Sequence, residues 1–376
     1  MKTVADRLFQ AERIHDGRDW HRDAVLRVRG DRVVGIEPAQ AGAEAMPGCI
    51  VPGLVDLQVN GGGGVMLNDA PTAETLATIV AAHERFGTTG LMATLITDRP
   101  EVTEAAIEAV AAVDLPGLLG LHLEGPHIAL ARKGTHDPAL IRPMEARDLS
   151  LLLSAARRLP HLMVTLAPES VTVAQVAALA DAGVVVSLGH SDCDLGTAQA
   201  YAEAGARMVT HLYNAMSQLG HRAPGLVGAA LSDGRLAAGL IADGFHVDDA
   251  ALGIALRGKA GPAGMFLVSD AMATVGSPIR GFQLNGRQIL RGAGRLTLAD
   301  GTLAGADIAL VDAVRHCRTA LGLPLEAALA LATTAPAAAL GVADRGHLRP
   351  GAQADFLCLG PDTRALATVV GGERVA

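Results

Sequence analysis

Eight short apolar runs, separated by longer amphipathic segments, constrain the fold of this chain more than any other feature of its sequence. Uninterrupted apolar runs of four to seven residues are typical of strands buried on both faces of a parallel sheet. Parallel strands need crossover connections, so the pattern predicts strands that alternate with helices. The runs occupy residues 54–59, 90–96, 117–123, 162–167, 184–188, 208–212, 236–241 and 265–268.

Segments between the runs show the period of amphipathic helices. The apolar positions of residues 145–159 recur at helical spacing, at Leu149, Leu152, Leu153, Ala156 and Leu159. A second such segment covers residues 173–182, and Gly183 directly after it is a typical helix stop. No GxGxxG turn follows the first run. Eight strand–helix units therefore favour an α/β fold of the (β/α)₈ TIM-like barrel type over an open dinucleotide-binding sheet.

Both ends of the chain have a different pattern. Short β-like stretches lie at residues 24–28 and 32–36, and again at 356–359 and 367–370. They predict one small β domain built from both termini, residues 1–50 and 346–376, beside a barrel of residues 51–345. Residues 281–303 predict a hairpin-like insertion in the barrel, because Asn285-Gly286 and Asp300-Gly301 are turn dipeptides.

Composition excludes several classes of partner. The 376 residues include 31 basic and 39 acidic side chains, for a formal net charge of −8, with one Trp, two Tyr and six Phe. Few aromatics and no basic run argue against nucleic-acid binding. The four cysteines form no CxxC pair, which argues against a disulfide framework. Charged residues at 6–13 and the lack of a long apolar stretch predict a cytoplasmic protein with no membrane partner.

Ionisable side chains lie at or just after the ends of four of the apolar runs, at Glu124, His190, His211 and Asp270. The carboxyl ends of barrel strands meet at one face, where active sites lie. One carboxylate and two imidazoles can hold a catalytic metal with one position open, and Asp270 can serve as a base beside it. A single histidine at a strand end is more often structural, but four such side chains at four strand ends favour a metal site.

Longer motifs surround these residues. They read His-Leu-Glu-Gly-Pro at 122–126, Gly-His-Ser at 189–191, His-Leu-Tyr-Asn-Ala-Met at 211–216 and Ser-Asp-Ala at 269–271. Less specific motifs at 51–56 and 346–355 extend the similarity over nearly the whole chain. Together they resemble the N-acetylglucosamine-6-phosphate deacetylases of the amidohydrolase superfamily. The resemblance implies a barrel of the metal-dependent hydrolase type with a small β-sandwich domain formed by both termini.

The resemblance also implies an activity, the hydrolysis of N-acetyl-D-glucosamine 6-phosphate to D-glucosamine 6-phosphate and acetate. By the same matching, Glu124, His190 and His211 would bind one divalent ion per subunit. Zn²⁺ is the first expectation, with Fe²⁺, Co²⁺ or Mn²⁺ as alternatives. Asp270 would act as general base and then acid, and His136 would contact the reacting carbonyl.

Substrate contacts are implied in the same way. Asn214 and Ala215 would receive the sugar phosphate, and Arg222 would add its charge from the neighbouring subunit of a homodimer. Thr135 would contribute a backbone contact. Asp243 and His246 would contact the sugar hydroxyls. Leu303, Ala304 and Gly305 would line the acyl end of the substrate.

One position departs from the pattern of the superfamily. Many amidohydrolases carry His-x-His after the first strand to hold a second metal, whereas this chain has Gln58-Val59-Asn60. Amides are poor zinc ligands beside imidazole, so we expect a single metal. Three alternatives stay open: a deacetylase of the galactosamine epimer, an amidohydrolase acting on a cyclic amide or an N-acyl amino acid, and a relative that kept the barrel without the chemistry.

Overall fold

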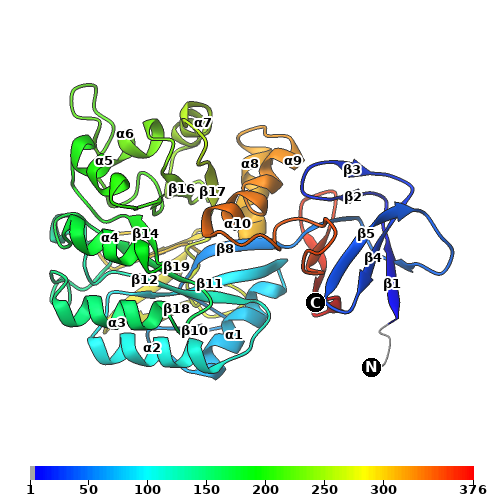
Figure 1. The fold of residues 1–376 in the computed structure, drawn as a ribbon, viewed down its shortest axis with the longest axis horizontal. Helices are drawn as coiled ribbons and strands as arrows, with labels where there is room; N and C mark the ends of the chain where they lie inside the picture. Colours follow the sequence, from blue (N-terminus) through cyan, green and yellow to red (C-terminus); the bar gives the residue numbers. More distant parts are fainter. Residues whose placement is uncertain (1–4) are drawn as a thin grey trace.

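The computed structural model describes residues 5–376 and consists of a barrel and a smaller β domain (Figure 1). Each predicted apolar run contributes one strand to an eight-stranded parallel sheet, which confirms the predicted barrel. In sheet order, the strands are β8 (Leu54–Val59), β11 (Thr88–Ile96), β12 (Leu118–Glu124), β13 (Leu162–Leu166), β14 (Val185–Leu188), β15 (Met208–Val209), β16 (Ala237–Leu240) and β17 (Met265–Leu267).

The barrel closes between its first strand and the residues that follow its last one. Val59 and Ala271 form a parallel bridge. The N–H of Asn60 donates to the carbonyl of Ala271 at 2.9 Å, and the N–H of Asp270 donates to the carbonyl of Gln58 at 3.0 Å. This closure lies at the carboxyl ends of both strands. It therefore brings residues 58–60 beside Asp270, although they are far apart in the sequence.

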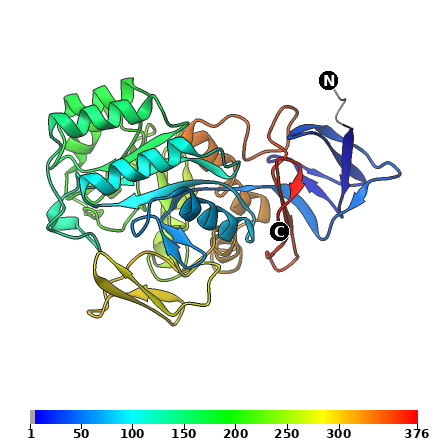
Figure 2. The ribbon, with the colours of Figure 1, turned by 90° about the horizontal axis from the view of Figure 1, so that it is seen from below.

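Helices cover the outside of the barrel (Figures 1 and 2). Side-chain oxygens of Thr72, Thr172, Asp194 and Asp248 cap four of them at the N-terminus. Gly183, at a φ of +83°, follows the fourth helix as predicted. The helices are α1 (Ala73–Glu84), α2 (Pro100–Ala112), α3 (Ala146–Ala156), α4 (Val173–Asp181), α5 (Leu195–Glu203), α6 (Gly225–Ser232), α7 (Asp249–Gly258), α8 (Leu310–Thr319), α9 (Leu325–Ala330) and α10 (Thr334–Leu340), with a short 3₁₀ turn, η1 (Leu130–Arg132).

The small β domain combines both ends of the chain in two sheets, as the sequence predicts. One sheet contains β5 (Arg32–Pro38), β4 (Ala24–Arg29), β1 (Asp6–Gln10) and β6 (Glu44–Ala45). The other contains β23 (Glu373–Arg374), β22 (Ala365–Val370), β21 (Phe356–Leu359), β7 (Cys49–Pro52), β2 (Ile14–His15) and β3 (Trp20–His21). Phe9 and Phe356 pack edge to face between the sheets, with ring centroids 5.0 Å apart. The boundaries at 50/51 and 345/346 stay predictions.

Residues 281–297 form a separate antiparallel sheet on the barrel, visible in yellow in Figure 2. It contains three strands where the sequence suggested a hairpin: β18 (Gly281–Leu284), β19 (Arg287–Gly292) and β20 (Arg295–Thr297). Asn285 and Gly286 both have positive φ, 48° and 73°, as expected for the tight turn of a hairpin. A shorter ribbon, β9 (Gly61–Gly62) with β10 (Val65–Met66), follows the first barrel strand. Within the described part of the chain, no helix has the length and hydropathy to cross a membrane.

Candidate active site

One pocket of about 250 Å³ opens at the carboxyl ends of the barrel strands, where the sequence predicts the site. Residues from seven different strand–loop connections and from the insertion line it. The predicted site residues in this lining are Glu124, Thr135, His136, His190, His211, Asn214, Ala215, His246, Asp270, Leu303 and Gly305.

Three of these side chains converge on one point. Glu124 is the last residue of β12, while His190 and His211 follow β14 and β15 by two residues each. Both imidazole Nε2 atoms approach the same Glu124 Oε1, His190 at 3.0 Å and His211 at 2.9 Å, and they lie 3.1 Å from each other. All three residues are buried. Three donor atoms this close to one another could hold one metal ion between them, and one carboxylate with two imidazoles is a known set of zinc ligands.

The tautomer of His190 tests whether this cluster fits a cation. Its Nδ1 lies 2.8 Å from the carbonyl oxygen of Arg132, and because a carbonyl can only accept, Nδ1 carries the proton. In the neutral ring, Nε2 then presents a lone pair to Glu124 and to His211. Those contacts would be repulsive without a positive charge between them. The ligand set therefore fits a divalent cation, and the contact with Arg132 is the kind of support that orients metal-binding histidines.

Electrostatics keep the carboxylate of this cluster ionised. Burial would raise the pKa of Glu124, but the neighbouring imidazoles of His190 and His211 outweigh burial and hold the pKa well below its ordinary value. Burial lowers the pKa of His211, and the neighbouring Glu124 raises it by more. An ionised carboxylate is the form that binds a metal, so the cluster is prepared for one.

Backbone geometry at the strand ends aims these side chains inward. His190, His211, Ala215 and Asp270 have φ values of 49°, 30°, 49° and 50°, in the left-handed region that non-glycine residues rarely adopt. Each such residue costs on the order of 1–3 kcal/mol and persists where the surrounding structure enforces it. The strain therefore marks the places where each chain segment leaves its strand and turns its side chain into the pocket.

Asp270 is held by the two amides that replace the His-x-His motif. Asn60 Nδ2 donates to Asp270 Oδ1 at 2.7 Å, and Gln58 Nε2 donates to the same oxygen at 3.1 Å. Gln58 Nε2 also lies 3.2 Å from Glu124 Oε2. Burial, followed by the charge of Glu124, raises the pKa of Asp270 to about 6. These amides thus bind the two carboxylates, a role that the sequence analysis missed although their place after the first strand pointed to the site.

His136 lies beside the metal cluster, with its ring centroid 4.4 Å from that of His190. Its Nδ1 lies 2.7 Å from the hydroxyl of Thr97, and burial together with the nearby His190 lowers its pKa to about 3. The ring is therefore neutral and available for hydrogen bonding. The carbonyl of Thr135, the preceding residue, accepts a hydrogen bond from Arg287 of β19.

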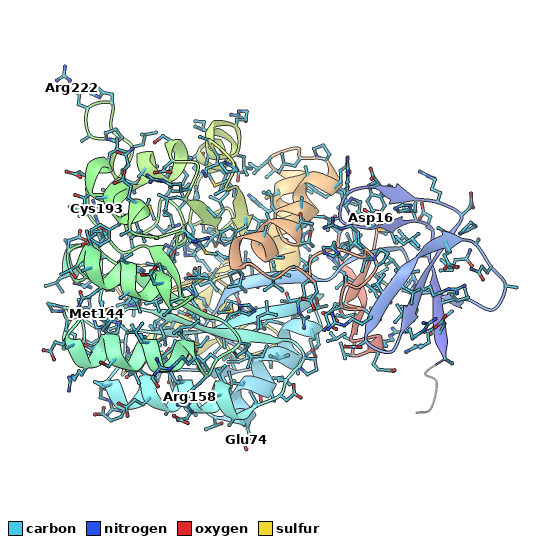
Figure 3. The ribbon with its side chains drawn as sticks, in the orientation of Figure 1. Asp16, Glu74, Met144, Arg158, Cys193 and Arg222 are labelled. Carbon is cyan, nitrogen blue, oxygen red and sulfur yellow. The ribbon has the colours of Figure 1, made fainter. Side chains whose placement is uncertain are left out.

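Three predicted residues lie outside the pocket lining. Asp243 lies behind His246, where its Oδ2 is 2.7 Å from the ring Nδ1, so it orients that ring. Ala304 is fully buried. Arg222 is exposed at the tip of a loop that projects away from the barrel (Figure 3), and it does not line the pocket of its own chain. Among the residues that the structure describes, none of those that line the pocket is an arginine or a lysine.

The lining also contains residues that were not predicted to contact the substrate or the metal: Asn60, Ile96, Gly134, Ile241, Met272 and Thr302. Thr97 and Arg287, which contact the His136 segment, were missed as well. Thr97 follows the second apolar run directly, so inspection of every strand end would have found it. Arg287 carries no such signal, because it lies in the insertion next to a hairpin turn.

A parallel barrel with a buried Glu-His-His cluster and a carboxylate beside it defines a metal-dependent hydrolase. Residues 49–375 match the amidohydrolase family, and the chain belongs to it.

Similar proteins include deacetylases of amino sugar phosphates. An N-acetylgalactosamine-6-phosphate deacetylase of Shewanella sp. (strain ANA-3) is 43% identical over 329 residues, which cover 87% of this chain and 83% of that protein. An N-acetylglucosamine-6-phosphate deacetylase of Danio rerio is 37% identical over 341 residues, covering 87% and 84%. The crystal structure of N-acetylglucosamine-6-phosphate deacetylase from Pasteurella multocida superposes with a TM-score of 0.94 at 30% identity, covering 98% of this chain and 99% of that one.

Proposed function

We propose that this enzyme hydrolyses the acetamide of N-acetyl-D-glucosamine 6-phosphate and releases D-glucosamine 6-phosphate and acetate. The observation that carries the proposal is the convergence of the Glu124–His190–His211 cluster, Asp270 and His136 on one pocket. The names of relatives that cover most of the chain support the choice of substrate class.

Water is a poor nucleophile toward an amide, and the amine is a poor leaving group. A divalent ion bound by Glu124, His190 and His211, with Zn²⁺ as our first candidate, would supply water activation and polarise the carbonyl. Asp270, ionised above its pKa of about 6, accepts the proton of the attacking water. It then delivers that proton to the sugar nitrogen as the C–N bond breaks. One carboxylate thereby serves first as base and then as acid.

Neutral His136 hydrogen-bonds the carbonyl oxygen of the substrate, where negative charge develops during attack. A donor placed at that oxygen stabilises the transition state more than the substrate, which is what accelerates the reaction. Leu303 and Gly305 line the same pocket and would border the acetyl group. His246, oriented by Asp243, would contact the sugar hydroxyls.

The phosphate would bind near Asn214 and Ala215, in a pocket whose lining, among the residues of one chain that the structure describes, contains no arginine or lysine. We propose that Arg222 of a second subunit supplies the charge, so that the enzyme acts as a homodimer. The exposed position of Arg222 on a projecting loop supports this arrangement. A guanidinium can form bidentate hydrogen bonds with phosphate oxygens, which suits this role.

The cytoplasmic location that the sequence suggests stays a prediction.

The test is a matched assay of N-acetylglucosamine and N-acetylgalactosamine, each with and without a 6-phosphate, with metal content measured on the same sample. We expect turnover of the phosphorylated N-acetylglucosamine and about one divalent ion per chain. Absence of turnover with both phosphorylated sugars by metal-loaded protein would refute the proposal. Two ions per chain would refute the single-metal interpretation of Gln58 and Asn60.

N-acetyl-D-galactosamine 6-phosphate is the second candidate substrate. The relative from Shewanella that carries this specificity in its name is 43% identical to the chain. The two sugars differ in the orientation of one hydroxyl, so the ratio of their kcat/KM values in the same assay decides between them.

A further inference from the structure

His136 lies on an irregular segment between η1 and α3, so no helix or strand fixes its ring. Within the segment, its N–H donates to the carbonyl of Lys133 at 3.0 Å. Two further hydrogen bonds reach residues 135 and 136 from outside the segment, one between the Thr97 hydroxyl after β11 and the His136 ring and one from Arg287 of β19 to the carbonyl of Thr135. A ring that must place a proton within hydrogen-bond reach of a reacting oxygen needs such support, because displacement of about 1 Å can cost about 100-fold in rate.

Thr97 can fix which nitrogen of His136 carries the proton. Its hydroxyl lies 2.7 Å from His136 Nδ1 and 3.4 Å from the carbonyl of Glu124. The hydroxyl has one hydrogen, and the imidazole nitrogen is much the closer acceptor. If the hydroxyl donates to Nδ1, the neutral ring carries its own proton on Nε2. That is the tautomer able to donate a hydrogen bond from the other side of the ring.

Close packing keeps the Thr97 hydroxyl in place. Gly125, at a φ of +83°, lies so near that a Cβ added to it would come within 2.1 Å of Thr97 Oγ1. The backbone of Thr97 is held as well, because Asn285 Nδ2 donates to its carbonyl at 3.3 Å. Asn285 belongs to the β18–β19 turn of the insertion.

Arg287, two residues after Asn285, holds the other side of the same site. Its Nη2 donates to the carbonyl of Thr135, the residue before His136. The Nε of Arg287 is buried. The insertion therefore donates hydrogen bonds to two backbone carbonyls, one beside the hydroxyl that contacts His136 and one beside His136 itself.

We propose that Thr97 and Arg287 are positioning residues for His136. Thr97 donates to Nδ1 and so keeps the Nε2 proton for the substrate carbonyl, while Arg287 holds the segment at the distance that this hydrogen bond requires. The inference rests on the proposed function, because it assigns these residues to the amide hydrolysis described above. It also gives the 281–297 sheet a role in the reaction.

Thr97→Val tests the proposed role of Thr97, since valine replaces the hydroxyl with a methyl group of similar size. We expect kcat to fall by about 10- to 100-fold, because removal of a whole donor to a developing oxyanion costs about 100- to 1,000-fold. KM and metal content should stay within about twofold. Thr97→Ser keeps the hydroxyl and should recover kcat to within about threefold of the unmodified enzyme. Equal kcat values for the Val and Ser variants would overturn the role of Thr97.

Arg287→Gln tests the proposed role of Arg287, and Arg291→Gln is its matched control. Arg291 lies on the same strand but binds Asp307 and the carbonyl of Ser277, away from His136. We expect Arg287→Gln to lower kcat by about tenfold with KM little changed. Arg291→Gln should lower only the thermal unfolding midpoint. Equal losses of kcat in both variants would mean that Arg287 acts through insertion stability alone, which would overturn its positioning role.

A spectroscopic measurement separates this inference from the proposed function. The ¹⁵N shifts of the His136 imidazole, assigned with a His136→Asn variant, report which nitrogen carries the proton. We expect the Nε2-protonated form in metal-loaded protein and a mixture of tautomers in Thr97→Val. An Nδ1-protonated ring in the unmodified protein would overturn the inference even if the enzyme is active. Lack of sugar-phosphate hydrolysis with an Nε2-protonated ring would overturn the function instead.

Discussion

The two ends of the pocket differ in how far one chain completes them. At the catalytic end, Glu124, His190, His211 and Asp270 are buried and hydrogen-bonded within a single barrel. At the other end, near Asn214 and Ala215, we propose that the phosphate binds; within the described residues this phosphate end offers no arginine or lysine, and Arg222 lies on an exposed loop. A barrel can prepare its own catalytic groups because its strand ends already converge. Recognition of an anion is left, in our proposal, to a second subunit.

Metal removal should give the largest effect, because it takes away the ion that we propose is held by Glu124, His190 and His211. We expect chelation to reduce activity in proportion to the metal lost, and Zn²⁺ addition to restore it. A metal ion that binds only the folded state should also raise the thermal unfolding midpoint. At a free metal concentration of 1,000 times its Kd, the stabilisation is about 4 kcal/mol. Metal analysis, activity and thermal unfolding on one titration series check this. Full activity in metal-free protein would contradict the prediction.

Asp270→Asn should give the next largest effect, a loss of kcat of about 10²- to 10⁴-fold. The asparagine oxygen can still accept the hydrogen bonds from Gln58 and Asn60, so the pocket should keep its shape. Metal content and the Kd for substrate therefore serve as internal controls and should be unchanged. Near-normal turnover would show that another group is the base.

Arg222→Gln should act at the phosphate end alone. Loss of a charge-assisted hydrogen bond costs about 1.5–3 kcal/mol, which predicts an increase in KM of about 10- to 150-fold for the phosphorylated sugar. Activity toward the unphosphorylated sugar should not change. Arg257→Gln, at an exposed arginine of α7, is the control and should behave as the unmodified enzyme.

Mixing two inactive or impaired variants sharpens the same comparison. In a dimer of one Arg222→Gln chain and one Asp270→Asn chain, arginine donation across the interface leaves one pocket with both an intact base and an intact arginine. We therefore expect the mixed dimer to recover low-KM activity toward the phosphorylated sugar, up to about half of normal. No recovery in a proven mixed dimer would place the arginine in its own chain.

The pH dependence of kcat should give the smallest effect. Burial and the charge of Glu124 raise the pKa of Asp270 to about 6, and the base works only when ionised, so kcat should fall as the pH drops through the acid limb. A bound cation favours the ionised form, which places this limb at or below about pH 6. The hydrogen bond from Asn60 lowers the pKa, so Asn60→Ala should move the limb to higher pH. An unchanged limb in that variant would contradict the assigned contact.

Local sequence determined the barrel and the strand ends at which its proposed catalytic residues lie, because both follow from the order of residues along single segments. Apolar runs of strand length set the eight strands, and the residues at and just after the end of each run necessarily lie at the carboxyl face of the barrel. Glu124, His190, His211 and Asp270 could be placed together on that ground alone. Asn285-Gly286 set the hairpin turn, since both residues tolerate positive φ.

Tertiary structure decided the contacts that tune these residues. Asn60 and Asp270 are 210 positions apart, and Arg287 and Thr135 are 152 apart, so no local pattern brings them together. Barrel closure places the two amides against Asp270, and the insertion carries Arg287 to the His136 segment. The direction of each side chain depends on strand register and loop path, which arise only when distant segments pack. The sequence by itself therefore pointed to the groups that we propose as catalytic, whereas the folded chain determined which side chains and backbone groups hold them in place.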